Sequence, residues 1–277
     1  MIASHLAPSP TESDVPETLP VTRSRLLDGV PGVVHGLTRR VPGLGDADGN
    51  LGYSAPRDAV DAWEMRRRWS AAIGVDPERL AAAGQVHGAD AIRVATTDAG
   101  RGARPGSGRV GLADALLTDE PGVALLSLHA DCLPLLLVDP VRPAVAVVHA
   151  GWRGTVADVA AAAVRAMTIH YGSRPADLLA FLGPAIGPCC YEVGPDVAAA
   201  WRARADGAEA VALTPTGDRW IFDLAAANAH LLLRAGLAPE HLERSGVCTR
   251  SAGDAWFSHR GQGPTTGRFG AIIALTG

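Results

Sequence analysis

Residues 128–155 read LHADCLPLLLVDPVRPAVAVVHAGWRGT, and this stretch determines the architecture that the sequence predicts. It holds two short apolar runs, 135–138 and 145–148, separated only by DPVRPA. That connection is too short for a helical crossover, so the runs are predicted to be neighbouring antiparallel strands. The second strand then passes through residues 150–154 into a helical pattern. Hairpins mixed with strand-to-helix turns predict an α/β fold with a mixed sheet.

Outward from this stretch, helical and strand patterns continue over most of the chain. Helices are predicted at 59–72, 156–169, 196–205 and 224–234, with Thr155 and Asp223 as the N-caps of the second and fourth. The predicted strands are 91–95, 115–118, 123–128, 135–138, 145–149, 178–182 and 270–274. No linker divides the chain, so we expect a flexible tail over residues 1–20 and one catalytic domain over residues 21–277.

The composition is that of a globular protein with a small acidic excess. Hydrophobic residues make up 47% of the chain, charged residues 19%, and the formal net charge is −4. No block of like charges indicates a nucleic-acid or membrane partner. Four cysteines in 277 residues do not form a disulfide framework, and the N-terminus lacks a signal-peptide pattern. We therefore expect a cytoplasmic protein, as a monomer or weak homodimer.

Three side chains are candidate metal ligands: His87 in GQVHGAD, Cys132 in LHADCLP and His149 in AVVHAGW. Each ends an apolar run or lies in a glycine-bounded turn. Three protein ligands leave a tetrahedral ion one open position, which is typical of a catalytic zinc. Taken singly, His149 is as consistent with a core histidine as with a metal ligand, and Cys132 is as consistent with a small buried hydrophobic residue. Pro134 is expected to interrupt the strand beside Cys132, and Asp131 is expected to accept a hydrogen bond from a ligand imidazole.

Other polar residues near these segments are weaker candidates. Arg153, in GWRGT, either binds an anion at the following helix N-terminus or stacks on Trp152. Cys189 and Cys190 are interpreted as packing residues. The side chains that could reach the site from other segments are Tyr191, Glu192, His259, Arg260 and the arginine-bearing loop 101–109.

Four long segments resemble one known family. GQVHGAD, ADALLTDEPGVALLSLHADCLPLLLVDP, AVAVVHAGWRGT and FLGPAIGPCCYEVGPDV are similar to the laccase-domain or YfiH-type proteins. These proteins have also been called multicopper polyphenol oxidase, purine nucleoside phosphorylase and peptidoglycan editing factor. The resemblance runs from about His35 to the C-terminus, where DAWFSHRGQGPTTGRFGAII resembles the closing segment of the family.

The resemblance implies a fold and an activity. It implies an α/β/α sandwich with a mixed sheet, and a zinc ion held by His87, Cys132 and His149. It further implies cleavage of purine nucleosides by phosphate, with adenosine deamination as a second activity. Arg40 aligns with an arginine of the family and Asn50, in GNLG, with its Asn-Leu-Gly.

The chain departs from the family pattern at several positions. Paired glycines after Arg40 are lost, His129 stands where a threonine is common, and Met65 replaces an asparagine. These changes leave the three predicted zinc ligands in place, and they affect the segments that would contact the substrate.

The expected mechanism uses Cys132, His149 and Arg40 as catalytic residues. Arg40, Asn50 and Arg153 would bind the substrate, and Arg40 or Arg153 would direct phosphate to the ribose C1′. Water in place of phosphate would attack the purine C6 and release ammonia.

Two other enzymatic activities, and a non-catalytic role as a metal or nucleoside sensor, remain open alternatives. One is copper-dependent phenol oxidation: copper binds such sites tightly in vitro, but the nine histidines include no His-x-His pair. The other is a Cys132–His149 dyad that hydrolyses a cell-wall precursor.

Overall fold

The hairpin predicted from residues 128–155 is the centre of the fold. In the computed structural model, which describes residues 18–277 except 55 and 205–207, β6 (Leu133–Asp139) pairs antiparallel with β7 (Ala144–Ala150). Every residue of both strands is buried. Burial on both faces explains why the two runs are continuously apolar instead of alternating.

A six-stranded mixed sheet forms around this hairpin, in the order β12-β8-β6-β7-β4-β3. β4 (Ala115–Thr118) pairs antiparallel with β7, and β8 (Leu179–Leu182) pairs antiparallel with β6. The outer strands β3 (Ala91–Arg93) and β12 (Leu242–Arg244) add in parallel to β4 and β8. The predicted strand 115–118 has the observed bounds, and the predicted strands 91–95, 135–138, 145–149 and 178–182 are present with ends that differ by one or two residues.

A second sheet has the order β1-β13-β5-β2. β13 (Phe269–Leu275) lies between β1 (Val33–Leu37) and β5 (Ala124–His129), antiparallel to both, and β2 (Leu80–Ala82) adds to β5 in parallel. A separate three-stranded sheet contains β9 (Glu192–Val193), β10 (Leu213–Thr216) and β11 (Arg219–Phe222).

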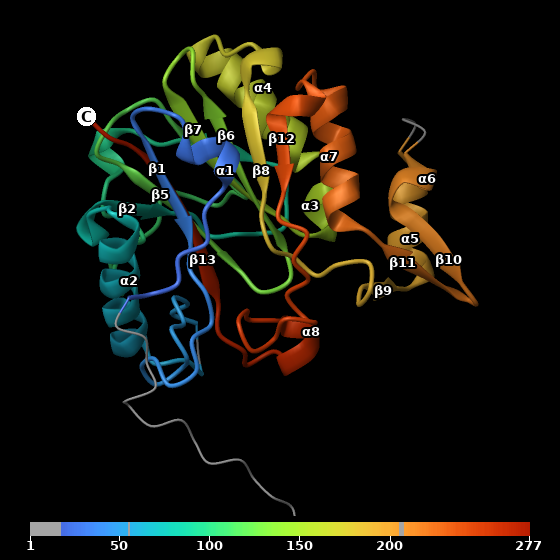
Figure 1. The fold of residues 1–277 in the computed structure, drawn as a ribbon, viewed down its shortest axis with the longest axis horizontal. Coiled ribbons are helices and arrows are strands. Elements are labelled where there is room, and N and C mark those ends of the chain that lie inside the picture. The colour runs from blue at the N-terminus through green and yellow to red at the C-terminus, as the bar shows by residue number, and fades with distance from the viewer. Residues whose placement is uncertain (1–17, 55, 205–207) are drawn as a thin grey trace, which may run out of the picture.

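The two larger sheets stack face to face between layers of helices (Figure 1). Leu136 and Val147 of one sheet pack with Leu125, Phe269 and Ile273 of the other in a common core. On the outer face of the second sheet lies α2 (Ala59–Ile73), whereas α4 (Val159–Tyr171) and α7 (Leu224–Arg234) cover the first. The α/β class with mixed β-sheets is confirmed, and the sandwich holds two stacked sheets between its helical layers.

The remaining helices are short. They are α1 (Arg25–Asp28), α3 (Trp152–Val156), α5 (Pro195–Arg202), α6 (Glu209–Ala212) and α8 (His259–Gln262). In Figure 1 the elements α5, α6 and β9–β11 lie at the edge of the molecule opposite α2. The predicted helix 224–234 has the observed bounds of α7, with Asp223 as its N-cap. The prediction for 196–205 ends at a residue outside the described ones. Most of the predicted tail also lies outside the described residues. Leu19, which is described, packs against the hydrophobic cluster that contains Trp69 of α2.

Two local predictions are wrong. The helix predicted from 156 starts earlier, as α3, and breaks at Asp158, whose left-handed φ of 72° separates α3 from α4. Thr155 therefore lies inside α3, where its hydroxyl accepts a hydrogen bond from Asn228. Pro134 does not interrupt the ladder: it is the second residue of β6, opposite His149, and contributes its carbonyl to Gly183. A proline at a strand's start removes no essential donor.

Among the helices that the structure describes, none has the length and apolar character that a membrane span requires.

Candidate active site

His149 lies near the end of β7, where the strand leads through Gly151 into α3. Its side chain is buried, and its Nδ1–H donates to the Asp114 carboxylate at 2.8 Å. Asp114 immediately precedes β4, the strand that pairs with β7, and its carbonyl accepts from the His149 backbone N–H. With Nδ1 occupied in this way, Nε2 is the nitrogen that His149 presents to a ligand.

The same carboxylate shapes the turn that carries His87. The backbone N–H groups of Val86, His87 and Gly88 donate to Asp114 at 3.1, 3.0 and 2.7 Å. His87 itself has a left-handed φ of 60°, which is uncommon outside glycine. Three charge-assisted hydrogen bonds hold this conformation in place, so Asp114 fixes both histidines relative to each other.

Cys132 lies in the tight connection between β5 and β6, after Asp131 in a left-handed conformation with φ 84°. His129 braces this turn from the end of β5. Since a carbonyl can only accept, His129 Nδ1–H donates to the Cys132 carbonyl at 3.2 Å, and Nε2 then accepts from the Ser127 hydroxyl at 2.7 Å. Full burial lowers the pKa of His129 well below its usual range, with repulsion from His149 adding to it, so the ring is neutral.

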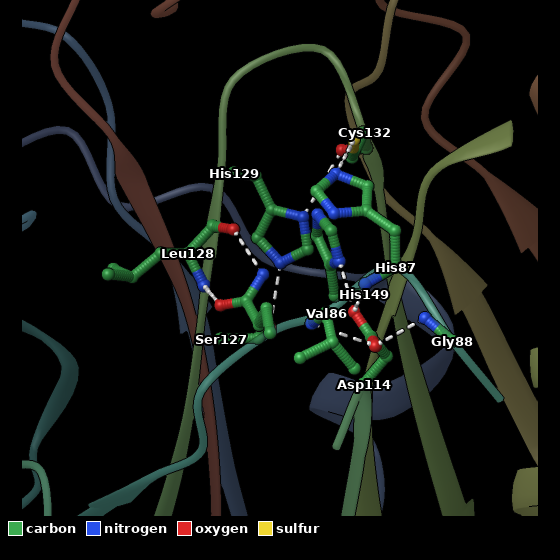
Figure 2. Close-up of polar contacts among 10 residues, drawn as sticks. Val86, His87, Gly88, Asp114, Ser127, Leu128, His129, Cys132 and His149 are labelled. Atoms are coloured by element: carbon green, nitrogen blue, oxygen red, sulfur yellow. Dashed lines mark hydrogen bonds and ion pairs between the residues drawn. The ribbon is translucent and has the colours of Figure 1, made fainter. Parts of the chain in front are cut away.

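The three predicted ligands meet in one cluster (Figure 2). Their ligand atoms all lie within 4.8 Å of one another, with Cys132 Sγ 3.8 Å from His87 Nε2. The rings of His87 and His149 meet edge to face at 4.8 Å between centroids. His149 is buried, Cys132 half-buried and His87 exposed, so the cluster opens towards solvent on one side.

The electrostatics of the cluster favour a charged pair. Burial opposes ionisation of Cys132, but the neighbouring His149 and hydrogen bonds from both histidines lower the pKa of the thiol below its usual range. Burial likewise opposes the charge on His149, whereas Cys132 and Asp114 outweigh it and raise the pKa of the imidazole. Without a metal, the site thus contains a thiolate beside an imidazolium.

The open side of the cluster faces a cavity of about 700 Å³. Five arginines line it and only one carboxylate does, Asp131. The arginines come from five separate segments: Arg57, Arg109, Arg153, Arg260 and Arg268. Such a positive, partly enclosed surface favours an anion. Trp152, Tyr191, Ile186, Leu128 and Leu224 add aromatic and apolar walls.

Several candidate residues from the sequence lie on this cavity. Tyr191, His259, Arg260 and Arg153 all line it, as does Arg109 from the loop 101–109. Arg153 also stacks on Trp152, with its guanidinium carbon 4.3 Å from the ring centroid. Glu192 is not among the lining residues; its carboxylate pairs with Arg219 instead.

Arg40 and Asn50 are not among the residues that line the cavity. The Arg40 guanidinium is bound to the Asp48 carboxylate and the Gly253 carbonyl at 2.8 Å each. Asn50 is buried and bonds to the backbone of Gly52 and Arg268, which do line the cavity. Asn50 therefore contributes by positioning those two residues, and Arg40 by fixing its own loop.

Two further expectations are corrected. The partner of a ligand imidazole is Asp114, not Asp131. Asp131 instead accepts from the Thr249 hydroxyl at 2.7 Å and the Arg260 backbone N–H at 2.6 Å, tying the Cys132 turn to α8. Cys190 is half-buried and packs against the core as expected, whereas Cys189 is exposed and is not a packing residue. The sequence analysis did not identify Asp114, because the one local signal that marks it is its position just before a strand.

The donor set suits a borderline-soft ion. Two imidazole nitrogens and a sulfur whose thiolate is already favoured are donors that zinc and copper both accept, and the Asp114–His149 contact is the usual support for a metal-binding histidine. The fold and site thus define a class: α/β proteins with a histidine–cysteine cluster open to an arginine-lined cavity.

The comparison with known families identifies the family within this class. The chain belongs to the family described as multi-copper polyphenol oxidoreductase laccase, whose model matches residues 34–276. Among curated relatives, the chain is 36% identical to purine nucleoside phosphorylase YlmD of Geobacillus stearothermophilus, over 87% of this chain and 90% of the relative. It is 39% identical to purine nucleoside phosphorylase SCO2081 of Streptomyces coelicolor, over 90% and 98%.

Solved structures show the same likeness. The crystal structure of YlmD from Geobacillus stearothermophilus superposes with a TM-score of 0.86 at 35% identity, covering 90% of this chain and 93% of that one. The Bacillus licheniformis hypothetical protein YfiH gives a TM-score of 0.83 at 32% identity, covering 88% and 93%.

Proposed function

We propose that this protein is a zinc-dependent purine nucleoside phosphorylase with an adenosine deaminase side activity. The observation that carries the proposal is the His87–Cys132–His149 cluster opening onto an arginine-lined cavity of about 700 Å³. A volume of this size suits a nucleoside together with phosphate. The names of the two curated relatives support the reaction class.

His87 Nε2, Cys132 Sγ and His149 Nε2 would hold the zinc, which when bound supplies Lewis-acid polarisation of an oxygen in the cavity. The cavity arginines bind phosphate. Among them, Arg153 closely follows the cluster residue His149 in the sequence. A phosphate oxygen attacks the ribose C1′ and the C1′–N9 bond breaks. N9 keeps the electron pair and takes up a proton, giving the free base and ribose 1-phosphate.

Tyr191 is suited to contact the base. Burial raises the pKa of its phenol, with the nearby Cys132 adding to the effect, so the hydroxyl remains protonated and can donate a hydrogen bond. Water in place of phosphate gives the side reaction: it adds at the purine C6, and the amino group leaves as ammonia.

A second candidate activity is favoured by the thiolate–imidazolium pair. The Cys132 thiolate would attack an ester or amide carbonyl, His149 would give its proton to the leaving group, and water would release the acyl group. A cell-wall precursor is the substrate class for this route.

Polyphenol oxidation, which the family description suggests, has less support. Within the described residues, the groups of three or more potential ligands are the His–Cys–His cluster and a cluster of three cysteines. A trinuclear copper centre needs many more histidines in one place. Copper would still bind the His–Cys–His site in vitro.

The central experiment incubates the pure protein with adenosine, with and without phosphate, and separates the products by chromatography. We expect adenine only when phosphate is present and inosine in both cases. Cys132→Ala and His149→Ala should lose bound zinc and both products together. His170→Ala, an exposed histidine of α4, is the matched control and should retain them. A fully zinc-loaded enzyme that forms neither product contradicts the proposal.

Alkylation of Cys132 separates the two candidates. A free cysteine has a pKa of about 8.5, and Cys132 lies below this, so the metal-free protein should react rapidly with iodoacetamide at pH 7. His149→Ala removes the imidazolium. The pH at which alkylation reaches half of its maximal rate should therefore rise, and alkylation at pH 7 should slow. Peptide mass analysis reports the site. A stoichiometric zinc ion should protect Cys132, whereas turnover by a zinc-free, alkylatable enzyme favours the dyad.

A further inference from the structure

Three cysteines outside the active site lie together on two neighbouring segments. Cys189 and Cys190 are in the turn that follows Gly187, and Cys248 follows β12. The sulfurs of all three lie within 4.8 Å of one another, and those of Cys189 and Cys190 are 3.5 Å apart. We call this group the three-cysteine cluster.

The backbone holds the two segments in register. Ala185 and Cys248 form a parallel β-bridge, and the Thr249 N–H donates to the Ala185 carbonyl at 2.9 Å. On the other side of the cluster, the N–H groups of Cys190 and Tyr191 both donate to the Gly187 carbonyl, closing the turn. A side chain at Gly187 would lie 3.1 Å from Cys248 Cβ, so glycine allows the two segments to approach this closely.

The surroundings favour a thiolate at Cys248; at Cys189 the Ser251 hydroxyl acts to lower the pKa of the thiol, but burial and the neighbouring thiols outweigh it and raise that pKa. The Gly187 N–H points at Cys248 Sγ from 3.2 Å, and the Ser251 hydroxyl lies 3.4 Å from Cys189 Sγ and 3.3 Å from Cys190 Sγ. Burial opposes ionisation of Cys248, but hydrogen bonds from the Ser251 and Gly187 backbone outweigh it and lower the pKa of the thiol to about 7.

We propose that the three-cysteine cluster is a second metal site, which binds one thiophilic closed-shell cation, Zn²⁺ or Cu⁺, through Cys189, Cys190 and Cys248. A Zn–S bond of about 2.3 Å places tetrahedral sulfurs about 3.8 Å apart, close to the separations already present. Sulfur-only donors select such ions over hard cations. The Ser251 hydroxyl lies where it can occupy a fourth position, and exposed Cys189 provides the route of entry.

The site is separate in its ligands from the His87–Cys132–His149 cluster, yet it adjoins the same cavity wall. Ile186 and Tyr191, on either side of the cysteine-bearing turn, both line the cavity. A bound ion would therefore link two segments: the turn that presents Tyr191 and the segment that leads into α8.

Metal stoichiometry tests the proposal with the full-length chain. Reduced, metal-free protein is titrated with Zn²⁺ against a chromogenic chelator, and separately with Cu⁺ under anaerobic conditions. We expect two ions per chain, one after Cys189→Ser, one after His87→Ala, and none after both changes. Because Cys189 is exposed, its replacement should leave the melting temperature unchanged. If the unaltered chain binds one ion, and only Cys189→Ser removes it, the result contradicts the active-site proposal and not this one.

A Cys132→Ser background isolates the cluster, because the chain has four cysteines and the other three all belong to it. One equivalent of Zn²⁺ or Cu⁺ should protect all three from alkylation, and Co²⁺ should give a near-ultraviolet thiolate charge-transfer band. Cys132→Ser with Cys248→Ser should lose both signals. The proposal fails if neither ion binds stoichiometrically, if binding survives Cys189→Ser, or if the cluster only forms a disulfide.

Discussion

At the scale of single residues, Asp114 is the centre of the candidate active site although it is not among the residues that line the cavity. Its carboxylate accepts from one imidazole and from three backbone N–H groups, and its side chain is fully buried. Burial alone would raise the pKa of this carboxyl, but the bonds from His149 and Gly88 lower it, so it remains charged. One buried anion thus orients two of the three proposed ligands.

Replacing this carboxylate tests that role. In Asp114→Asn the amide nitrogen cannot accept from the Val86 and Gly88 N–H groups, so the His87 turn loses its anchor. We expect zinc affinity to fall about 10- to 100-fold while the protein stays folded. Competition with a chelator gives the affinity. Asp119→Asn, an exposed carboxylate paired with Arg93, is the matched control and should leave it unchanged. Equal affinities in both variants would refute the role of Asp114.

Gly151 provides the space in which the cluster forms. A Cβ there would lie 2.8 Å from His87 Cδ2 and 3.0 Å from Cys132 Sγ. Its φ of −78° is ordinary, so steric exclusion is the reason for glycine at this position.

We expect Gly151→Ala to weaken zinc binding at least tenfold, because the methyl group pushes His87 and Cys132 out of position. Gly29→Ala is the control, since that glycine has a φ of −83° and nothing within 4 Å of its added Cβ. Zinc titration and melting temperature should be measured together. Unaltered zinc binding by Gly151→Ala would show that the cluster relaxes around the methyl group.

At the scale of elements, the ends of strands and the breaks in helices position the side chains of the candidate site. β5, β6 and β7 bring His129, Cys132 and His149 to adjacent turns, and the early start of α3 puts Trp152 and Arg153 on the cavity. α2 has a different task. Its buried face, with Trp69 at its centre, covers the far side of the β1-β13-β5-β2 sheet.

Trp69→Ala separates this structural task from the site. Trp69 is completely buried, and truncation of such a side chain costs about 3–5 kcal/mol of unfolding free energy. We expect that loss in chemical denaturation, with zinc stoichiometry unchanged wherever the protein is folded. Val60→Ala, on the exposed side of the same helix, should change stability by less than about 0.5 kcal/mol. A loss of zinc from folded Trp69→Ala would mean that α2 also supports the site.

At the scale of the whole molecule, charge is distributed unevenly. The chain carries 25 basic and 29 acidic residues, yet its cavity collects five arginines against one aspartate. The field inside the cavity is thus opposite in sign to the net charge, which selects an anion close to the site.

Screening by salt should therefore weaken phosphate binding. Raising potassium chloride to about 0.5 M, where the Debye length is only a few ångströms, should raise the KM for phosphate several-fold. The KM for adenosine, which is uncharged, should change little. Arg153→Gln should raise the KM for phosphate at low salt and reduce this dependence. A KM for phosphate that is indifferent to salt would contradict a role for the arginine-lined wall.

The sequence by itself determined the local structure and the ligand types. Apolar runs bounded by turns predicted the β6–β7 hairpin, and the cap at Asp223 predicted α7. Histidine and cysteine at strand ends gave candidate ligands, and the family resemblance predicted that they form one cluster. The signals for the hairpin and for α7 are encoded within about ten neighbouring residues, so periodicity and capping suffice to find them.

Only the tertiary structure decided which polar groups meet. Asp114 reaches His149 across 35 residues, and Cys189 meets Ser251 across 62. The five cavity arginines come from segments spread over the whole chain, and two sheets stack where one was expected. None of this has a local signature, because side-chain pairing between distant segments depends on how the sheets pack and not on the order of residues along either strand.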